Sequence, residues 1–366
     1  MLRRYRMSAD GEHAVTARVY TRDEHGIDRD QFDRDALAVV GRLQRAGHEA
    51  YVVGGAIRDL ITGRIPKDVD VATSARPRMV TRLFSRARII GRRFKIVHVP
   101  AGRQGIVEVS TFRGPATAGT GTGGTGTGGT GTDGDNHYGT MAEDALRRDF
   151  TVNGLYYCPR RQQIIDYVAG FRDLTAGRLR TIGDPGQAFM DDPVRMLRAI
   201  KYAAFLGVRV PEGYRRLIRR HAGLLGECPT GRLSEELRKL LASGNGSAIV
   251  LDCARLGLLA AMLPAVAGCV RPRRQDPLIV ELAHIERTAR AGEEVRQRAM
   301  AALAAAVNGT ASDPTLRGVK EAFAPLAITN DDARSIVASL GGGQVEPNAG
   351  PRRRRSRSRR ARHAGG

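Results

Sequence analysis

The sequence contains 366 residues, 42% of them hydrophobic, which is enough for two or three domains with a substantial core. Its net charge is +21, and without the eight arginines of the last sixteen residues it is still +13 (21 − 8). This excess favours a polyanionic partner, either nucleic acid or an anionic membrane surface, and of the two we expect nucleic acid.

Cysteine usage and the hydrophobic runs argue against several other classes of protein. The four cysteines lie far apart and form no CxxC pair, so neither a zinc site nor a disulfide framework is expected. The start, MLRRYRMSAD, has no apolar signal-peptide stretch. The run LGLLAAMLPAVAG (256–268) is interrupted by proline and is shorter than the ~20 residues of a membrane span. We therefore expect a cytoplasmic protein that does not use a membrane as a partner.

The first half of the chain predicts short strands alternating with helices. Helices are expected at residues 33–47, AIRDLITG (56–63) and PRMVTRLF (77–84). Strands are expected at AYVV (50–53), VDVA (69–72), ARII (87–90), KIVHV (95–99) and GIVEVSTF (105–112). This order predicts an α+β fold that begins with a head containing a small mixed β-sheet.

A low-complexity segment follows these strands. Sixteen of the nineteen residues from 114 to 132 are Gly or Thr, which is typical of a flexible insert. A formal GxGxxG occurs at Gly121, Gly123 and Gly126, but no helix is predicted after it. We therefore interpret the segment as a loop and not as a dinucleotide site.

From Met141 onward the pattern becomes mostly helical. A strand pair, TVNGLYYC (151–158) and QIIDYV (163–168), comes first. The helical stretches that follow are DPVRMLRAIKYAAFL (192–206), LSEELRKLLAS (233–243), AIVLDCARLGLLAAM (248–262) and QDPLIVELAHIERTARAG (275–292). The shift in composition near residue 190 predicts the main domain boundary, and the arginine-rich end predicts disorder.

Two aspartates in KDVDVA (67–72) suggest a metal site. Side chains of a strand alternate between its faces, so Asp68 and Asp70 are expected on one face, where their charges repel each other unless a cation lies between them. Mg²⁺ (or Mn²⁺) is typically held by one or two carboxylates together with substrate phosphates. Glu108, on a neighbouring predicted strand, is a possible third carboxylate of a two-metal site. The alternative is an ordinary surface pair of aspartates.

A glycine doublet precedes this strand in VVGGAIRDL. Gly54 and Gly55 lack Cβ atoms, so the turn and the helix start after it can approach a phosphate closely. Arg58, one turn into the predicted helix, offers a forked donor suited to phosphate oxygens. Alternatively, the doublet is only a turn.

Two later segments concentrate charged residues. In RRDFTVNGLYY, Arg148 and Asn153 are candidates to face nucleotide phosphates and sugar, with Asp149 orienting them or the metal; an Arg–Asp ion pair with an Asn turn is the alternative. In DDPVRML, Asp192 is expected to be the N-cap before Pro193. Capping does not explain why Arg195 and Arg198 share one side of that helix.

In this order, VVGGAIRDLITG…KDVDVAT, RRDFTVNGL and DDPVRMLRA resemble motifs of the class II tRNA nucleotidyltransferase and bacterial poly(A) polymerase family, from about Ala17 to about Ala267. DYVAGFRDLTAGRLRTIG resembles the family's flexible element between head and neck. The resemblance implies that Asp68 and Asp70 are metal-binding catalytic residues. It implies that the ribose and nucleotide are bound by Arg147, Arg148, Asp149 and Asn153. It also implies that Asp192 and Arg195 read the incoming base. Asp191 stands where the family usually has Glu.

The implied organisation has five parts. They are an N-terminal extension (1–30), a nucleotidyltransferase head (31–190) with an insert (113–137), a helical neck that binds RNA and nucleotide (191–270), a helical body (271–345) and a disordered basic tail (346–366). The implied activity is template-independent addition of AMP from ATP to RNA 3′ ends, with release of pyrophosphate.

Within the family, IIGRRFKIVHV (89–99) and the N-terminal TRDEHGIDRDQFDRDAL resemble the poly(A) branch, which favours mRNA and other transcripts as substrates. The alternative in the same family is a CCA-adding tRNA nucleotidyltransferase. An alternative of another class is a non-catalytic basic RNA-binding protein, against which the intact Asp68, Asp70 and Arg58 argue. A metal-dependent phosphohydrolase would usually need His ligands, and His98 alone lies near the motifs.

Overall fold

The computed structural model describes residues 2–4, 16–91, 95–102, 105–114, 137–290, 292–309 and 314–341. The predicted insert at 113–137, apart from its end residues, and the predicted tail at 346–366 lie outside the described residues. No helix in the described part of the chain has the length and apolar character needed to cross a membrane.

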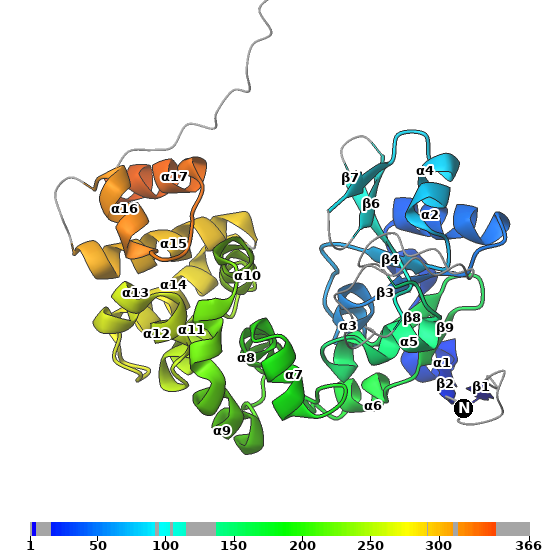
Figure 1. The fold of residues 1–366 in the computed structure, drawn as a ribbon, viewed down its shortest axis with the longest axis horizontal. Helices are drawn as coiled ribbons and strands as arrows, with labels where there is room; N and C mark the ends of the chain where they lie inside the picture. Colours follow the sequence, from blue (N-terminus) through cyan, green and yellow to red (C-terminus); the bar gives the residue numbers. More distant parts are fainter. Residues whose placement is uncertain are drawn as a thin grey trace, which may run out of the picture.

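Strands from the N-terminal half form one sheet, as Figure 1 shows on its right-hand side. Within the described residues its order is β1-β2-β9-β8-β3-β4-β7-β6-β5. Only β4 and β7 are parallel, and all other neighbours are antiparallel. The strands are β1 (Leu2–Arg4), β2 (Ala17–Tyr20), β3 (Ala50–Val53), β4 (Asp70–Thr73), β5 (Arg88–Ile90), β6 (Ile96–Ala101), β7 (Gly105–Thr111), β8 (Leu155–Cys158) and β9 (Gln163–Asp166).

Helices cover both faces of this sheet because its central strands are apolar on both sides. Val52 and Val71 belong to a core shared with α2, α3 and α4, whereas Tyr51 and Ala72 belong to a second core under α5. Adjacent residues of a strand point to opposite faces, which explains why neighbours enter different cores. The helices of this part are α1 (Arg22–His25), α2 (Arg34–Arg45), α3 (Gly55–Ile61), α4 (Pro77–Leu83) and α5 (Met141–Leu146).

After β9 the described chain is helical. Figure 1 shows α6 and α7 at the base, leading from the sheet to a separate stack of helices on the left. The helices are α6 (Gly170–Thr175), α7 (Pro185–Asp191), α8 (Val194–Leu206), α9 (Glu212–His221), α10 (Thr230–Leu241), α11 (Gly246–Arg255), α12 (Leu258–Met262), α13 (Pro264–Cys269), α14 (Pro277–Thr288), α15 (Glu293–Asn308), α16 (Leu316–Ala322) and α17 (Asn330–Leu340). The architecture confirms the predicted α+β class with a mixed sheet followed by helices. The exact boundaries of the five predicted parts remain predictions.

Two side chains from the loop after α3 reach across to the helices. The Arg64 guanidinium lies 3.8 Å from the centre of the Phe205 ring, and its Nη2 donates to the Phe205 carbonyl at 2.9 Å. Lys67 Nζ donates to the carbonyl of Ala242, just after α10, at 3.3 Å. These contacts join the sheet part to the helical part beside the aspartate pair.

The structure corrects several sequence-based boundaries. The stretch predicted as a strand from residue 151 begins with a 3-10 turn, Thr151–Asn153, and the strand starts only at Leu155. Residues 17–20, predicted to lie in an N-terminal extension, form β2 of the sheet. The single helical stretch predicted at 248–262 is two helices, because Gly257 has a φ of +83° that ends the first helix.

Candidate active site

The carboxylates of the KDVDVA segment owe their position to strand pairing. Asp70 is the first residue of β4 and pairs across the ladder with Val53, whose side chain lies on the α5 face. Val71 pairs in parallel register with Val109, so Glu108 precedes Val109 as Asp70 precedes Val71. Alternation therefore places Asp70 and Glu108 on the same face of adjacent strands. Asp68 lies two residues before Asp70, in the loop just outside the strand and exposed to solvent.

A cavity of about 280 Å³ lies on this face, at the end of α5. Its lining residues are Val53, Asp70, Ile96, Glu108, Ser110, Arg113, Asp144, Arg147 and Arg148. Asp70 reaches solvent, but protein atoms crowd its carboxylate and reduce its hydration. This desolvation raises the pKa of Asp70 to about 6, with further upward contributions from the Glu108 and Asp68 charges, against which the Arg148 charge acts.

The residues present fit a divalent cation. Desolvation, together with the nearby charges of Glu108 and Asp68, raises the Asp70 pKa, and a bound cation relieves the repulsion between these carboxylates. Two carboxylates plus substrate phosphates suit Mg²⁺. Glu108 lies on the correct face, but its carboxylate faces His98 Nε2 at 3.4 Å on β6. Among the described residues no group of three or more His, Cys, Asp or Glu side chains is placed to hold a metal. Asp68 and Asp70 remain the residues predicted to hold one, with Glu108 on the same face as Asp70.

Arg148 is held rigidly at the edge of the cavity. Its Nη2 donates to Asp144 Oδ2 at 3.0 Å, its Nε donates to the Tyr156 hydroxyl at 3.1 Å, and the Tyr156 hydroxyl donates to the same Asp144 oxygen at 2.6 Å. Burial disfavours its charge, but Tyr156 and Asp144 raise the pKa of Arg148 above its ordinary value. A permanent, oriented positive charge therefore faces the carboxylates.

The glycine turn contains a backbone conformation that favours glycine. Gly54 has a φ of +70° and a ψ of −127°, a conformation that disfavours any residue with a Cβ, and an added Cβ would lie 3.6 Å from Arg148 Nη1. Arg58 is placed differently from the expectation of a free phosphate donor. Its guanidinium binds Asp59 through Nε and Nη2, and its Nη1 donates to Asn153 Oδ1 at 2.8 Å.

A chain of polar contacts continues from Asn153 into the helical part. Asn153 Nδ2 donates to Asp149 Oδ1 at 3.0 Å, and Arg198 Nη1 of α8 lies 3.5 Å from Asp149 Oδ2. Arg198 also pairs with the buried Glu236 of α10 at 3.3 Å. The structure therefore brings together Arg58, Asn153, Asp149 and Arg198, which are separated by up to 140 residues in sequence, although Arg198 is used in ion pairs.

Asp192 and Arg195 lie next to each other at the start of α8. The prediction that Asp192 is the N-cap is wrong, because α8 begins at Val194 with Pro193 as its N-cap, and Asp192 is the C-cap of α7. Its Oδ1 still accepts from the Val194 N–H at 3.2 Å. Arg195 Nε lies 4.0 Å from Asp192 Oδ2, and Arg195 Nη2 donates to the Arg147 carbonyl at 3.5 Å. Arg232 of α10 donates to Asp192 Oδ2 at 2.7 Å.

Sequence reasoning missed several residues of this region. Asp144 and Tyr156 position Arg148, and the spacing of four between Asp144 and Arg148 was a signal for a helical ion pair. Arg232 and Glu236 come from α10, about 40 residues from their partners on the chain. No local pattern could have identified them, because the fold alone brings them close.

Comparison with known proteins identifies the family of the chain. Residues 50–180 match the family model described as the poly A polymerase head domain, and residues 207–269 match the one described as the probable RNA and SrmB-binding site of polymerase A. The chain is 45% identical over 239 residues to Poly(A) polymerase I of Haemophilus influenzae, covering 65% of this chain and 53% of that protein. It is 35% identical over 212 residues to the CC-adding tRNA nucleotidyltransferase of Halalkalibacterium halodurans, covering 58% and 49%.

Solved structures show the same fold. The CCA-adding enzyme of Bacillus stearothermophilus in complex with CTP superposes with a TM-score of 0.61 at 27% identity, covering 84% of this chain and 69% of that one. The chain spans about half the length of the curated relatives it matches. The head-domain match, the identity to a bacterial poly(A) polymerase and the shared fold lead to one conclusion: the chain belongs to the nucleotidyltransferase family that includes bacterial poly(A) polymerases and CCA-adding enzymes.

Proposed function

We propose that this protein is a template-independent polynucleotide adenylyltransferase that adds AMP from ATP to RNA 3′ ends. The observation that carries the proposal is the 45% identity to a bacterial poly(A) polymerase, compared with 35% to a CC-adding enzyme, over similar stretches of the chain. The three arginines in the wall of the cavity beside Asp70 and the overall charge of +21 support a polyanionic substrate.

In this proposal, Asp68 and Asp70 hold the divalent cation, which when bound assists the attack of the RNA 3′-hydroxyl and offsets phosphate charge. Arg148, fixed by Asp144 and Tyr156, stabilises negative charge that develops on the α-phosphate. Arg113 and Arg147 line the same cavity and neutralise the remaining phosphates. Pyrophosphate leaves without a covalent enzyme intermediate.

Base choice is proposed to rest on the group at the start of α8. Asp192 supplies carboxylate acceptors and Arg195 supplies donors, which together can pair with the edge of an adenine. Arg232 holds Asp192 from the neighbouring helix at 2.7 Å and limits its movement. Asp149 and Asn153, which are hydrogen-bonded to each other, are proposed to contact the ribose.

The test is an extension assay with a generic RNA and with a tRNA lacking its 3′ end, given Mg²⁺ and each nucleotide separately. The expected product is a run of A on both RNAs, with poor use of CTP. Efficient C incorporation that occurs only on the tRNA and stops at a fixed length would overturn the proposal in favour of CCA addition. CCA addition is the second candidate function, and the solved structure of a CCA-adding enzyme with the same fold supports it.

A non-catalytic RNA-binding role is the alternative of another class. It predicts RNA binding without incorporation of any nucleotide under the same conditions. The Asp68–Asp70 pair argues against it, because a protein that only binds RNA gains nothing from adjacent carboxylates that repel both each other and the phosphates.

A further inference from the structure

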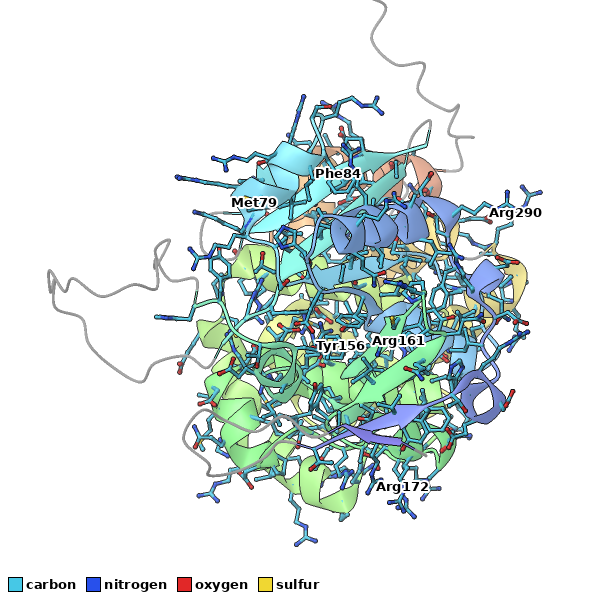
Figure 2. The ribbon with its side chains drawn as sticks, turned by 90° about the vertical axis from the view of Figure 1, so that its right-hand side faces the viewer. Met79, Phe84, Tyr156, Arg161, Arg172 and Arg290 are labelled. Carbon is cyan, nitrogen blue, oxygen red and sulfur yellow. The ribbon has the colours of Figure 1, made fainter. Side chains whose placement is uncertain are left out.

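A second group of basic side chains lies where β2 pairs with β9, away from the carboxylates. Two adjoining cavities of about 850 and 310 Å³ open there and share Arg18, Ala169 and Arg180 in their walls. Arg172 and Arg178 complete the wall of the smaller cavity. We call these four residues, Arg18, Arg172, Arg178 and Arg180, the arginine cluster. Figure 2 shows Arg172 reaching outward at the lower margin of the molecule.

The positive charge of the arginine cluster is not balanced by its surroundings. The carboxylates in the two cavity walls are Asp166 and Asp173. Asp173 is used internally, since its Oδ2 accepts from Thr151 Oγ1 at 2.7 Å and from Arg180 Nε at 2.8 Å. Asp166 lies opposite Arg18 in the strand ladder and is buried, but its oxygens accept backbone N–H groups of α6 and the turn before it.

Two guanidinium groups of the cluster, those of Arg172 and Arg178, therefore remain available. Among the described residues, their side chains form no ion pair. Arg18 is used inside the wall, since its charge acts on Asp166 and Tyr20, although its enclosed Nη1 has no hydrogen-bond partner. Arg172 and Arg178 are exposed. Unpaired guanidinium groups that converge on an open cavity are suited to an anion with several oxygens, and their planar forks match phosphate.

The arginine cluster is connected to the candidate active site. Leu146, at the end of α5, lines the larger cavity, whereas the next residue, Arg147, lines the cavity of Asp70. Consecutive Cα atoms are only about 3.8 Å apart, so neighbouring residues at the end of this helix contribute to the walls of both cavities. The wall of the larger cavity is also hydrogen-bonded to the RRDFT segment, through Thr151 N to the Arg180 carbonyl at 2.9 Å and Ile182 N to the Asp149 carbonyl at 3.1 Å.

We propose that the arginine cluster binds backbone phosphates of the RNA substrate a few nucleotides before its 3′ end, while the terminal hydroxyl lies at Asp70. The proposal rests on the proposed function for the identity of the substrate as RNA. Phosphate contacts position a nucleic acid without reading its sequence. Such contacts suit an enzyme that extends unrelated RNAs, and they leave base selection to the incoming nucleotide.

The test uses the double variant Arg172→Gln/Arg178→Gln, which removes two exposed charges that make no ion pair. The matched control is Arg317→Gln/Arg334→Gln, which removes two exposed charges from α16 and α17. Binding of a 5′-labelled single-stranded RNA is measured by fluorescence anisotropy over a series of salt concentrations. If both arginines contact phosphates, the slope of log K against log salt falls by about 1.4 in the cluster variant, at ~0.7 per contact, and stays unchanged in the control.

Steady-state kinetics supply the second readout. The KM for RNA should rise in the cluster variant, whereas the KM for ATP and the kcat at saturating RNA should not change. An unchanged salt slope together with an unchanged KM for RNA overturns the proposal. The proposal is also overturned if the cluster variant no longer binds inorganic pyrophosphate or ATP in calorimetry while its RNA binding is unaffected. That result would identify a site for small phosphates instead.

The two proposals fail separately. Suppose that the wild-type chain adds no nucleotide but the slope of log K against log salt still falls in the cluster variant. The proposed activity is then wrong and the RNA contact stands. If the chain polyadenylates RNA and the slope does not change, the arginine cluster is wrong and the activity stands. Thermal unfolding of both double variants checks that they fold as the wild type does.

Discussion

The position of one carboxylate illustrates how the backbone builds the site. Asp70 is the first residue of β4 and pairs with Val53, the last residue of β3, at the point where the strand enters the sheet. Its side chain therefore lies on the same face as buried apolar residues, but these residues do not bury it. This placement explains a carboxylate that is both solvent-accessible and poorly hydrated, with a pKa raised to about 6 by desolvation.

Replacing this carboxylate should remove activity without removing RNA binding. In Asp70→Asn, the loss of one ligand charge weakens cation binding, and metal assistance is worth several kcal/mol, so we expect nucleotide addition to fall at least ~100-fold. RNA affinity depends on arginines elsewhere and should stay within about twofold. Extension of a labelled RNA with ATP and Mg²⁺ measures the first effect and anisotropy the second. Asp252→Asn, on α11, is the control, and near-normal turnover of Asp70→Asn would refute the assignment.

Asn153 is predicted to matter for stability as well as for the site. It is almost fully buried and joins Arg58 to Asp149 through both ends of its amide. Asn153→Ala removes one hydrogen bond from each of these charged partners, which keep their ion pairs with Asp59 and Arg198. The change should cost about 1–3 kcal/mol and lower the melting temperature by several degrees.

The exposed Asn330→Ala serves as the control for Asn153→Ala. Its single contact is an exposed hydrogen bond from Lys320, so it should change stability by no more than about 0.5 kcal/mol. Calorimetry of both variants decides the question. Equal melting temperatures would show that the Arg58–Asn153–Asp149 contacts contribute little.

At the scale of elements, the break between α11 and α12 depends on one residue. The hydrophobic pattern from 248 to 262 is continuous, but Gly257 adopts a left-handed conformation that redirects the chain. The turn brings α12 back against the 3-10 turn Ala222–Glu227 and α11. The element boundary is thus set by backbone conformation and not by hydrophobic period.

Substitution of two glycines should have opposite effects. Gly257→Ala forces a Cβ into a left-handed conformation and should destabilise the protein by about 1–2 kcal/mol. Gly268→Ala lies inside α13, where an added Cβ meets no atom within 4 Å, and should stabilise it by up to ~1 kcal/mol. Chemical denaturation of the two variants measures both changes. A stabilising Gly257→Ala would contradict the assigned role of the turn.

At the scale of the whole molecule, the sheet part and the helical part meet beside the site. Asp70 and Arg148 come from one part, whereas Asp192, Arg198 and Arg232 come from the other. The polar chain through Asp149 and the contacts of Arg64 and Lys67 hold the two parts in register. Activity that needs both groups should therefore depend on this junction.

Arg64→Ala tests the junction directly. The variant loses a hydrogen bond and a stacked contact on Phe205, which together are worth about 1–2 kcal/mol. We expect hydrogen exchange of amides in α3 and α8 to become roughly tenfold faster, with the interior of the sheet unaffected. Arg78→Ala, exposed on α4, is the control. Protection equal to that of the wild type would show that Arg64 does not hold the two parts together.

The sequence by itself determined the order of most helices and strands, the α+β class and the family, because these follow from local periodicity and from contiguous motifs. It also indicated the Asp68–Asp70 pair, but the expectation that both lie on one strand was wrong, because β4 begins only at Asp70. Only the tertiary structure decided which partners these residues meet. Arg58 is committed to Asp59 and Asn153, Glu108 faces His98, and Arg232 holds Asp192, because pairing across strands and between helices joins residues that are distant in the chain. The arginine cluster likewise exists only because β2 pairs with β9, which places Arg18 beside a helix that begins about 150 residues later.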